Sequence, residues 1–145
     1  MKFMVMVMVP TSSESEAGVL PDAKELEAMD KFGEEMVTAG VMLAAEGLQP
    51  TSRGARIAFS GGTTTVVDGP FTESKELIAG FSILKAKSRE EVVAMMRRAP
   101  FAEGVTLEVR QLHDPADFAS LDPTGELLAK DAVLREQMLA NSKLP

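Results

Sequence analysis

The residues best suited to chemistry in this chain follow a run of Thr and Val that ends at Asp68. Asp68 precedes Gly69-Pro70, a pair that cannot continue a strand because proline fixes φ and removes a backbone donor. A carboxylate beside such a turn can be partly desolvated, which raises its pKa toward the range of a general base. Asp68 is therefore our first candidate catalytic residue. The alternative is that its carboxylate bonds a backbone amide of its own turn.

Two further side chains could take part in proton transfer. Glu46 precedes Gly47 at the end of an apolar run, where it could face the same pocket as Asp68 or stand in solvent. His113 is the single histidine and is followed by Asp114, so the two could form an acid–base pair; the alternative is an exposed histidine bonded to a loop. We take Glu46 and His113, with Asp68, as candidate catalytic residues.

Charged side chains on both sides of the turn are candidates for holding a ligand. Glu73 and Lys75 stand two residues apart, so on a strand they would share a face, where they could contact a ligand or pair with each other. Arg53 and Arg56 could receive a carboxylate or a phosphate, or could be solvated. From this set we take Arg56, Glu73 and Lys75 as candidate ligand-binding residues.

The composition excludes several classes of protein. The 145 residues, 45% of them hydrophobic, suffice for one domain with a true core. The absence of cysteine removes disulfides and thiol catalysis, and one histidine cannot build a multi-histidine centre, so we expect no metal and no cofactor. A formal charge of -7 opposes phosphate binding and argues against a nucleic-acid partner. A cysteine-free chain fits a reducing cytoplasm.

Residues 3–9 form an unbroken apolar run that ends at Pro10. About eight apolar residues are too few to span a membrane, and no small-residue cleavage site follows, so we expect neither a signal peptide nor a membrane anchor. An apolar run without polar alternation is typical of a central strand buried on both faces. The chain has 10 Met and no Trp or Tyr, which predicts a core packed with flexible thioethers.

Local signals define the remaining elements. Asp22 and Glu25 form a capping pair at the start of a helix, and Ser88 with Glu91 repeats that spacing. The Gly61-Gly62 pair supplies the positive φ angles of a tight hairpin turn. In chain order we expect a helix at 23–39, a strand at 41–45, hairpin strands at 56–60 and 63–67, a strand at 80–86, a helix after residue 88, a strand at 106–112, a loop at 114–122 and a helix at 126–141.

The order of these elements is β-α-β, an inserted β-hairpin, then β-α-β and a terminal helix. This pattern predicts an α+β, ferredoxin-like fold with both helices on one face of the sheet. We expect residues 1–113 to form this domain and residues 114–145 to form an appended loop and amphipathic helix. The other sheet face would be bare, and because the first strand is apolar on both faces, we expect that face to pack on a second copy as a homodimer.

The turn and its surroundings also carry a family resemblance. The chain resembles the YCII-related family, specifically the DGPF-domain proteins of bacteria, over residues 1–112. The motifs that carry the resemblance are Val67-Asp68-Gly69-Pro70-Phe71, Thr72-Glu73-Ser74-Lys75-Glu76, Ala39-Gly40-Val41, Glu46-Gly47-Leu48 and Glu108-Val109-Arg110. This resemblance implies a dimeric α/β barrel, in which two ferredoxin-like units pack sheet to sheet.

For function, the resemblance implies two different roles. Some DGPF proteins are linked to extracytoplasmic-function sigma factors, whereas other relatives resemble small lyases that use a His-Asp pair. The helix from Asp22 to Ala39 holds no histidine, so that pair cannot be copied onto this chain. We expect a cytoplasmic homodimer that binds a small molecule or a protein partner such as a sigma factor. The alternative is a cofactorless lyase or isomerase with Asp68 as general base, assisted by Glu46, Lys75 or His113.

Overall fold

The computed structural model describes residues 1–142 and divides the chain into two compact units, Met1–Leu112 and the segment from His113 onward. No helix within the described residues is long and apolar enough to cross a membrane. The first unit contains β1 (Lys2–Pro10), α1 (Ala23–Thr38), β2 (Met42–Gly47), η1 (Thr51–Arg53), β3 (Ala55–Ser60), β4 (Thr63–Asp68), β5 (Glu76–Lys85), α2 (Arg89–Met96) and β6 (Thr106–Gln111). The second contains η2 (Pro115–Leu121) and α3 (Glu126–Asn141).

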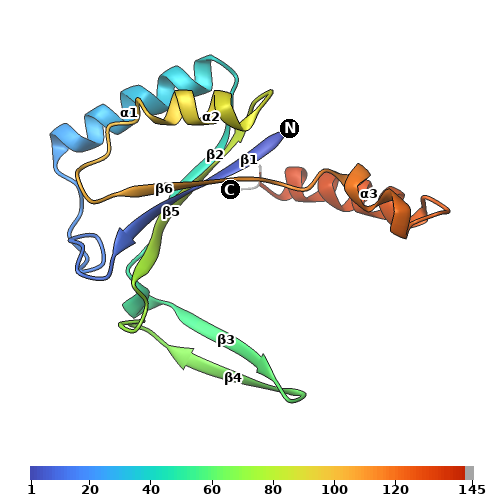
Figure 1. Cartoon of the computed structure of the whole chain (residues 1–145), viewed down its shortest axis with the longest axis horizontal. Helices are drawn as coiled ribbons and strands as arrows, with labels where there is room; N and C mark the ends of the chain where they lie inside the picture. The colour runs from blue at the N-terminus through green and yellow to red at the C-terminus, as the bar shows by residue number, and fades with distance from the viewer. Residues whose placement is uncertain (143–145) are drawn as a thin grey trace. The chain divides into compact units, whose positions relative to one another are not determined.

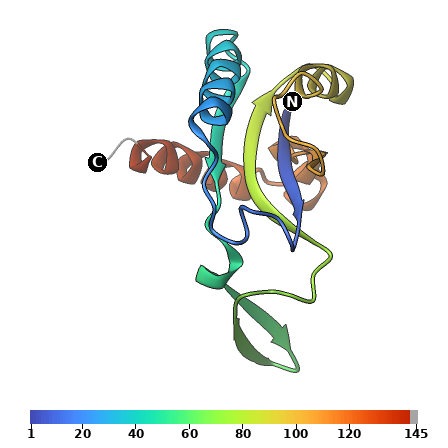
Figure 2. The same ribbon diagram turned by 90° about the vertical axis from the view of Figure 1, so that its left-hand side faces the viewer.

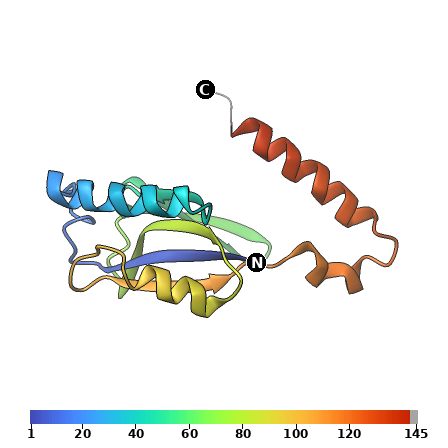
Figure 3. The same cartoon turned by 90° about the horizontal axis from the view of Figure 1, so that it is seen from above.

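The first unit is built on a four-stranded antiparallel sheet with the order β2-β5-β1-β6. Its two helices lie on the same side of this sheet (Figure 1), and α1 and α2 are seen side by side over it from above (Figure 3). This arrangement confirms the predicted α+β, ferredoxin-like fold. The apolar N-terminal run becomes β1, an inner strand of the sheet, as its lack of polar alternation predicts.

The hydrophobic core lies between the sheet and the two helices. Phe3 and Val5 of β1 and Leu84 of β5 are almost fully buried on the covered face. Phe32 and Met36 of α1 pack onto the same cluster, and Val92 and Met96 of α2 complete it. Because side chains alternate along a strand, every second residue of β1 must point the other way.

The opposite side of the sheet, which we call the open face, is also apolar at its centre. The strand register pairs Met4 with Ile83, Met6 with Phe81 and Met8 with Ile78 across β1 and β5. The three methionines of β1 and both Phe81 and Ile83 are only partly buried within the single chain. On β6 the same face carries the polar side chains Thr106, Glu108 and Arg110. The open face is therefore an apolar centre with a polar edge.

Strands β3 and β4 pair only with each other, and their hairpin projects away from the four-stranded sheet (Figure 2). The turn lies at Gly61 and Gly62, whose φ angles are 58° and 75°, as the Gly-Gly signal predicts. Ile57, Phe59 and Val66 share one face of the hairpin and are exposed. A two-stranded hairpin with an apolar face is marginally stable alone, so its root must be fixed by other contacts.

Two predicted strands differ from the structure by more than one residue at a boundary, and one predicted loop contains a short helix. The strand expected at 80–86 begins earlier, at Glu76, because residues 76–79 continue the pairing with β1 beyond a bulge between Val7 and Met8. The strand expected at 41–45 is shifted to Met42–Gly47. The loop expected at 114–122 contains the 3-10 helix η2, because Pro115 occupies its first turn, where a missing N–H costs nothing.

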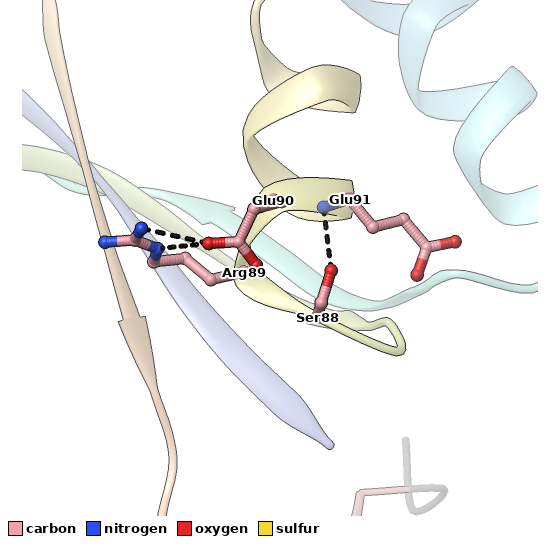
Figure 4. Close-up of polar contacts among 4 residues, drawn as sticks. All are labelled: Ser88, Arg89, Glu90 and Glu91. Carbon is pink, nitrogen blue, oxygen red and sulfur yellow. Dashed lines mark hydrogen bonds and ion pairs between the residues drawn. The ribbon is translucent and has the colours of Figure 1, made fainter.

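The start of α2 is capped as the sequence predicts (Figure 4). The backbone N–H of Glu91 donates to the Ser88 hydroxyl at 3.2 Å, and Arg89 donates two hydrogen bonds to one Glu90 oxygen, at 2.9 and 3.0 Å. The backbone N–H of Glu90, followed by the Arg89 guanidinium, lowers the pKa of the Glu90 carboxyl. Because the pKa is lowered, the hydrogen bonds to the ionised Glu90 carboxylate favour the folded state at neutral pH. This stabilisation is lost as the pH falls through the lowered pKa.

Candidate functional site

The turn at Gly69-Pro70 is fitted tightly against the 3-10 helix η1. The backbone N–H of Gly69 donates to the Gly54 carbonyl at 2.9 Å. A Cβ added at Gly69 would lie 1.7 Å from the carbonyl oxygen of Thr51, closer than any non-bonded contact allows. The glycine at this position is therefore required by the close approach of two backbone segments.

Glu16 and Thr51 hold this turn in place. The Glu16 carboxylate accepts hydrogen bonds from the Thr51 backbone N–H, at 3.1 Å to each oxygen, and from the Thr51 hydroxyl. The Thr51 Oγ1 in turn accepts from the Phe71 backbone N–H at 3.1 Å. We did not predict either residue, because 35 positions separate them and no local pattern indicates the contact. The Asp-Gly-Pro-Phe segment is thus the root of the hairpin; residues 51–54 anchor it directly, and Glu16 supports it through Thr51.

Asp68 lies at the end of β4, opposite Ala55, and is exposed. Its carboxylate makes no hydrogen bond to the described residues, so the bond to its own turn that we considered is not seen. It also does not line either of the two large cavities of the first unit. In this structure Asp68 therefore stands on the surface beside the turn.

The larger cavity, which we call the sheet–helix cavity, lies between the covered sheet face and the helices and has a volume of about 520 Å³. Its walls are mainly apolar and include Val5, Phe32, Gly33, Met42, Met96 and Phe101. Glu46 also contributes to the lining and lies at the sheet edge, opposite Phe81 in the register. Of the three candidate catalytic residues, Glu46 is the one that reaches a cavity.

The second cavity, which we call the hairpin-root cavity, has a volume of about 500 Å³ and lies around η1, between the four-stranded sheet and the start of β3. Arg56 lines it, with the guanidinium carbon 4.0 Å from the centre of the Phe71 ring and one N–H donating to the Ser74 hydroxyl at 2.9 Å. Glu73 and Lys75, the other two candidate ligand-binding residues, are exposed and form no ion pair within residues 1–142. The structure therefore brings Arg56, but not Glu73 or Lys75, to a cavity.

His113 belongs to the second unit, where its partner is Asp117 and not Asp114. Its Nδ1 lies 3.2 Å from a carboxylate oxygen of Asp117, and its ring packs edge-on against Phe118 at 5.2 Å between centroids. The Asp117 carboxylate also accepts from the Asp114 backbone N–H at 3.0 Å. Of the two alternatives, the structure agrees with an exposed histidine that is bonded to the following segment, because η2 carries Asp117 back over His113. Pro115, a good helix-start residue, is the signal that could have indicated this turn.

Comparison with known proteins identifies the chain's family. Residues 1–114 match the YCII-related domain. An uncharacterised protein of Rhizobium meliloti (strain 1021) is 32% identical over 103 residues, which cover 68% of this chain and 83% of that protein. Among solved structures, the chain is similar to 5-chloro-2-hydroxyhydroquinone dehydrochlorinase from Burkholderia phenoliruptrix AC1100, in complex with 2,5-dihydroxybenzoquinone, with 12% identity, a TM-score of 0.44 and coverage of 78% and 94% of the two chains. The family match over most of the sequence carries the conclusion that this chain belongs to the YCII-related domain family.

Proposed function

We propose that this YCII-related protein is a homodimer that binds a small organic molecule in the sheet–helix cavity. The observation that carries the proposal of binding is the cavity itself: about 520 Å³ of space with apolar walls and few polar groups. Cavities of several hundred Å³ with this kind of lining are the usual form of a small-molecule site. Asp30 and Ser82 are polar lining residues through which a ligand could be oriented. Glu46 also lines the cavity, but its register partner Phe81 belongs to the open face, so Glu46 stands at the sheet edge.

The proposal of a homodimer rests on the open face. Met4, Met6 and Phe81 form part of an apolar surface at the centre of the sheet, and no described element of the first unit is packed over it as the helices are over the other face. A second copy would cover this surface with an identical one, which is the isologous arrangement typical of dimers. Two sheets packed in this way would form the dimeric α/β barrel that the family resemblance implies.

A protein partner, such as a sigma factor, and a cytoplasmic location are further parts of the proposal that rest on the family resemblance and on the absence of cysteine. The enzyme alternative, a lyase or isomerase with Asp68 as general base, has less support because Asp68 is exposed and lies outside both cavities. We expect Asp68→Asn to change the unfolding free energy by less than about 0.5 kcal/mol and to leave ligand-induced thermal shifts unchanged. If Asp68→Asn lost the ligand-induced shifts in thermal-melt experiments, Asp68 would have to be part of the binding site.

Filling the sheet–helix cavity tests whether it is the binding site. Gly33 lines the cavity, and a Cβ added there meets no atom within 4 Å, so Gly33→Leu should place a side chain in the empty space. The substitution also replaces a helix-interior glycine in α1, so the folded chain should lose no stability. We expect a compound that raises the melting temperature of the wild type to lose this effect in Gly33→Leu.

The matched control is Gly33→Ala, which gives a similar helix gain but fills little of the cavity. We expect it to keep the ligand-induced shift, which reaches about 2.7 kcal/mol when the ligand is present at a hundred times its Kd. The measurement is a thermal-shift screen of a metabolite panel on the three proteins. If a compound raised the melting temperature of Gly33→Leu as much as that of the wild type, the sheet–helix cavity would not be its binding site. If no compound of the panel raised the melting temperature of the wild type, the result would count against small-molecule binding.

A further inference from the structure

The hairpin-root cavity differs in chemistry from the sheet–helix cavity. Its apolar walls come from Met8 and Ile78 at the end of the open face, Leu48 and Pro50 before η1, and Phe71 and Leu77 after the turn. These residues approach one another because the Thr51 contacts fix the turn against η1. At about 500 Å³, the space is of the size that holds a small organic molecule.

Two guanidinium-bearing residues, Arg53 and Arg56, line this cavity. Neither forms an ion pair with a carboxylate among residues 1–142. Phe71 and Ser74 hold the Arg56 side chain, through a ring contact at 4.0 Å and a hydroxyl that accepts one hydrogen bond. Both of these partners are neutral, so they position the guanidinium without compensating its charge, and its remaining N–H groups have no acceptor within the described chain.

The charge of the cavity is opposite to that of the protein. Its titratable lining residues are Arg53, Arg56 and Glu76, so cations outnumber carboxylates. Glu76 does not lie within ion-pair distance of either arginine. In a chain whose formal charge is -7, a concave surface with excess positive charge attracts anions specifically at that place.

We propose that the hairpin-root cavity is a second binding site, which takes an organic anion with a compact apolar body. The anionic head would be held by Arg53 and Arg56, since a guanidinium can donate two parallel hydrogen bonds to such a group. The apolar body would lie against Met8, Leu48 and Ile78. This site shares no lining residue with the sheet–helix cavity, so the inference is independent of the ligand site proposed there. Met8 and Ile78 belong to the open face, so the site adjoins the proposed dimer surface.

A matched pair of fluorescent probes tests the proposal. Anilinonaphthalene sulfonate carries an apolar body and an anionic head, whereas phenylnaphthylamine has the same aromatic body without the charge. Both are titrated into Gly33→Leu protein, in which the sheet–helix cavity is filled. We expect Arg53→Gln and Arg56→Gln each to raise the Kd of the sulfonate about tenfold, the effect of losing one charged hydrogen bond. The Kd of the neutral probe should change less than about twofold.

The control is Arg97→Gln, which removes the same charge from the end of α2, outside this cavity. We expect it to leave the Kd of both probes unchanged. Arg53→Gln carries the test even if Arg56→Gln disturbs the hairpin root, because the Arg53 side chain makes no hydrogen bond to the described residues. The proposal would be overturned if Arg53→Gln left the Kd of the sulfonate unchanged relative to Gly33→Leu protein that keeps Arg53. It would also be overturned if Arg53→Gln raised the Kd of the charged and the neutral probe equally.

Discussion

Replacement of Gly69 by alanine is expected to lower the free energy of unfolding by about 3 kcal/mol, the upper part of the range for overpacking a well-fitted site. The added Cβ would lie 1.7 Å from the Thr51 carbonyl oxygen and 2.5 Å from its carbon, so one of two backbone segments must move. Movement of the Thr51 segment would also break the hydrogen bond to the Phe71 N–H. Urea unfolding followed by circular dichroism measures the change.

Gly33→Ala is the matched control for this substitution. A Cβ at Gly33 meets no atom within 4 Å, and a helix interior favours alanine over glycine by about 1 kcal/mol, so this variant should be more stable than the wild type. The two substitutions add the same methyl group and differ only in what it meets. If Gly69→Ala cost less than about 1 kcal/mol, the close fit of the turn against η1 would not be what holds the hairpin root.

The second large effect is expected from a charge placed in the open face. Met6 lies on the inner strand β1 opposite Phe81, at the centre of the proposed dimer surface. In Met6→Lys, dimerisation would bury an ammonium group without a partner, which costs several kcal/mol. We expect the dimer Kd to rise by at least about a hundredfold, so that the single chain predominates at micromolar concentration. Sedimentation equilibrium measures both the mass and the Kd.

Val93→Lys is the control, because Val93 is 40% exposed on α2, away from the open face. It introduces the same charge and should leave the mass of the assembly unchanged. Ile83→Lys, on the neighbouring strand β5 and on the same face, should act like Met6→Lys. Circular dichroism of each variant checks that it stays folded. If both open-face variants remained dimeric, the dimer interface would have to lie on a surface other than the open face.

The elements that the sequence predicted well are those with local signals. The helix after Asp22 begins where a capping box forms between Asp22 and Glu25, and the hairpin turns at Gly61-Gly62. Both signals act within a few residues, so they can be recognised without knowledge of the fold. The ferredoxin-like topology then follows from the order of the elements, because few arrangements connect them with short loops.

The candidate site was predicted less well, because its geometry depends on contacts between distant residues. The carboxylate of Glu16 reaches Thr51 across 35 positions, and this contact decides where the hairpin leaves the sheet. The direction of the hairpin in turn leaves Asp68 exposed, while Arg56 meets Phe71 and lines a cavity. No periodicity in the sequence carries this information. The sequence predicts a turn at Gly69-Pro70. That this turn anchors the hairpin is seen only from the contact of Gly69 with η1 in the structure.

The most direct test of the proposed homodimer is the mass of the unmodified chain in solution. Light scattering coupled to size-exclusion chromatography, across the micromolar range, should give twice the chain mass of 15.5 kDa. This result is expected because the open face offers an apolar surface that a second copy can cover. A mass of 15.5 kDa throughout that range would contradict it, because the apolar centre of the sheet would then stand in solvent.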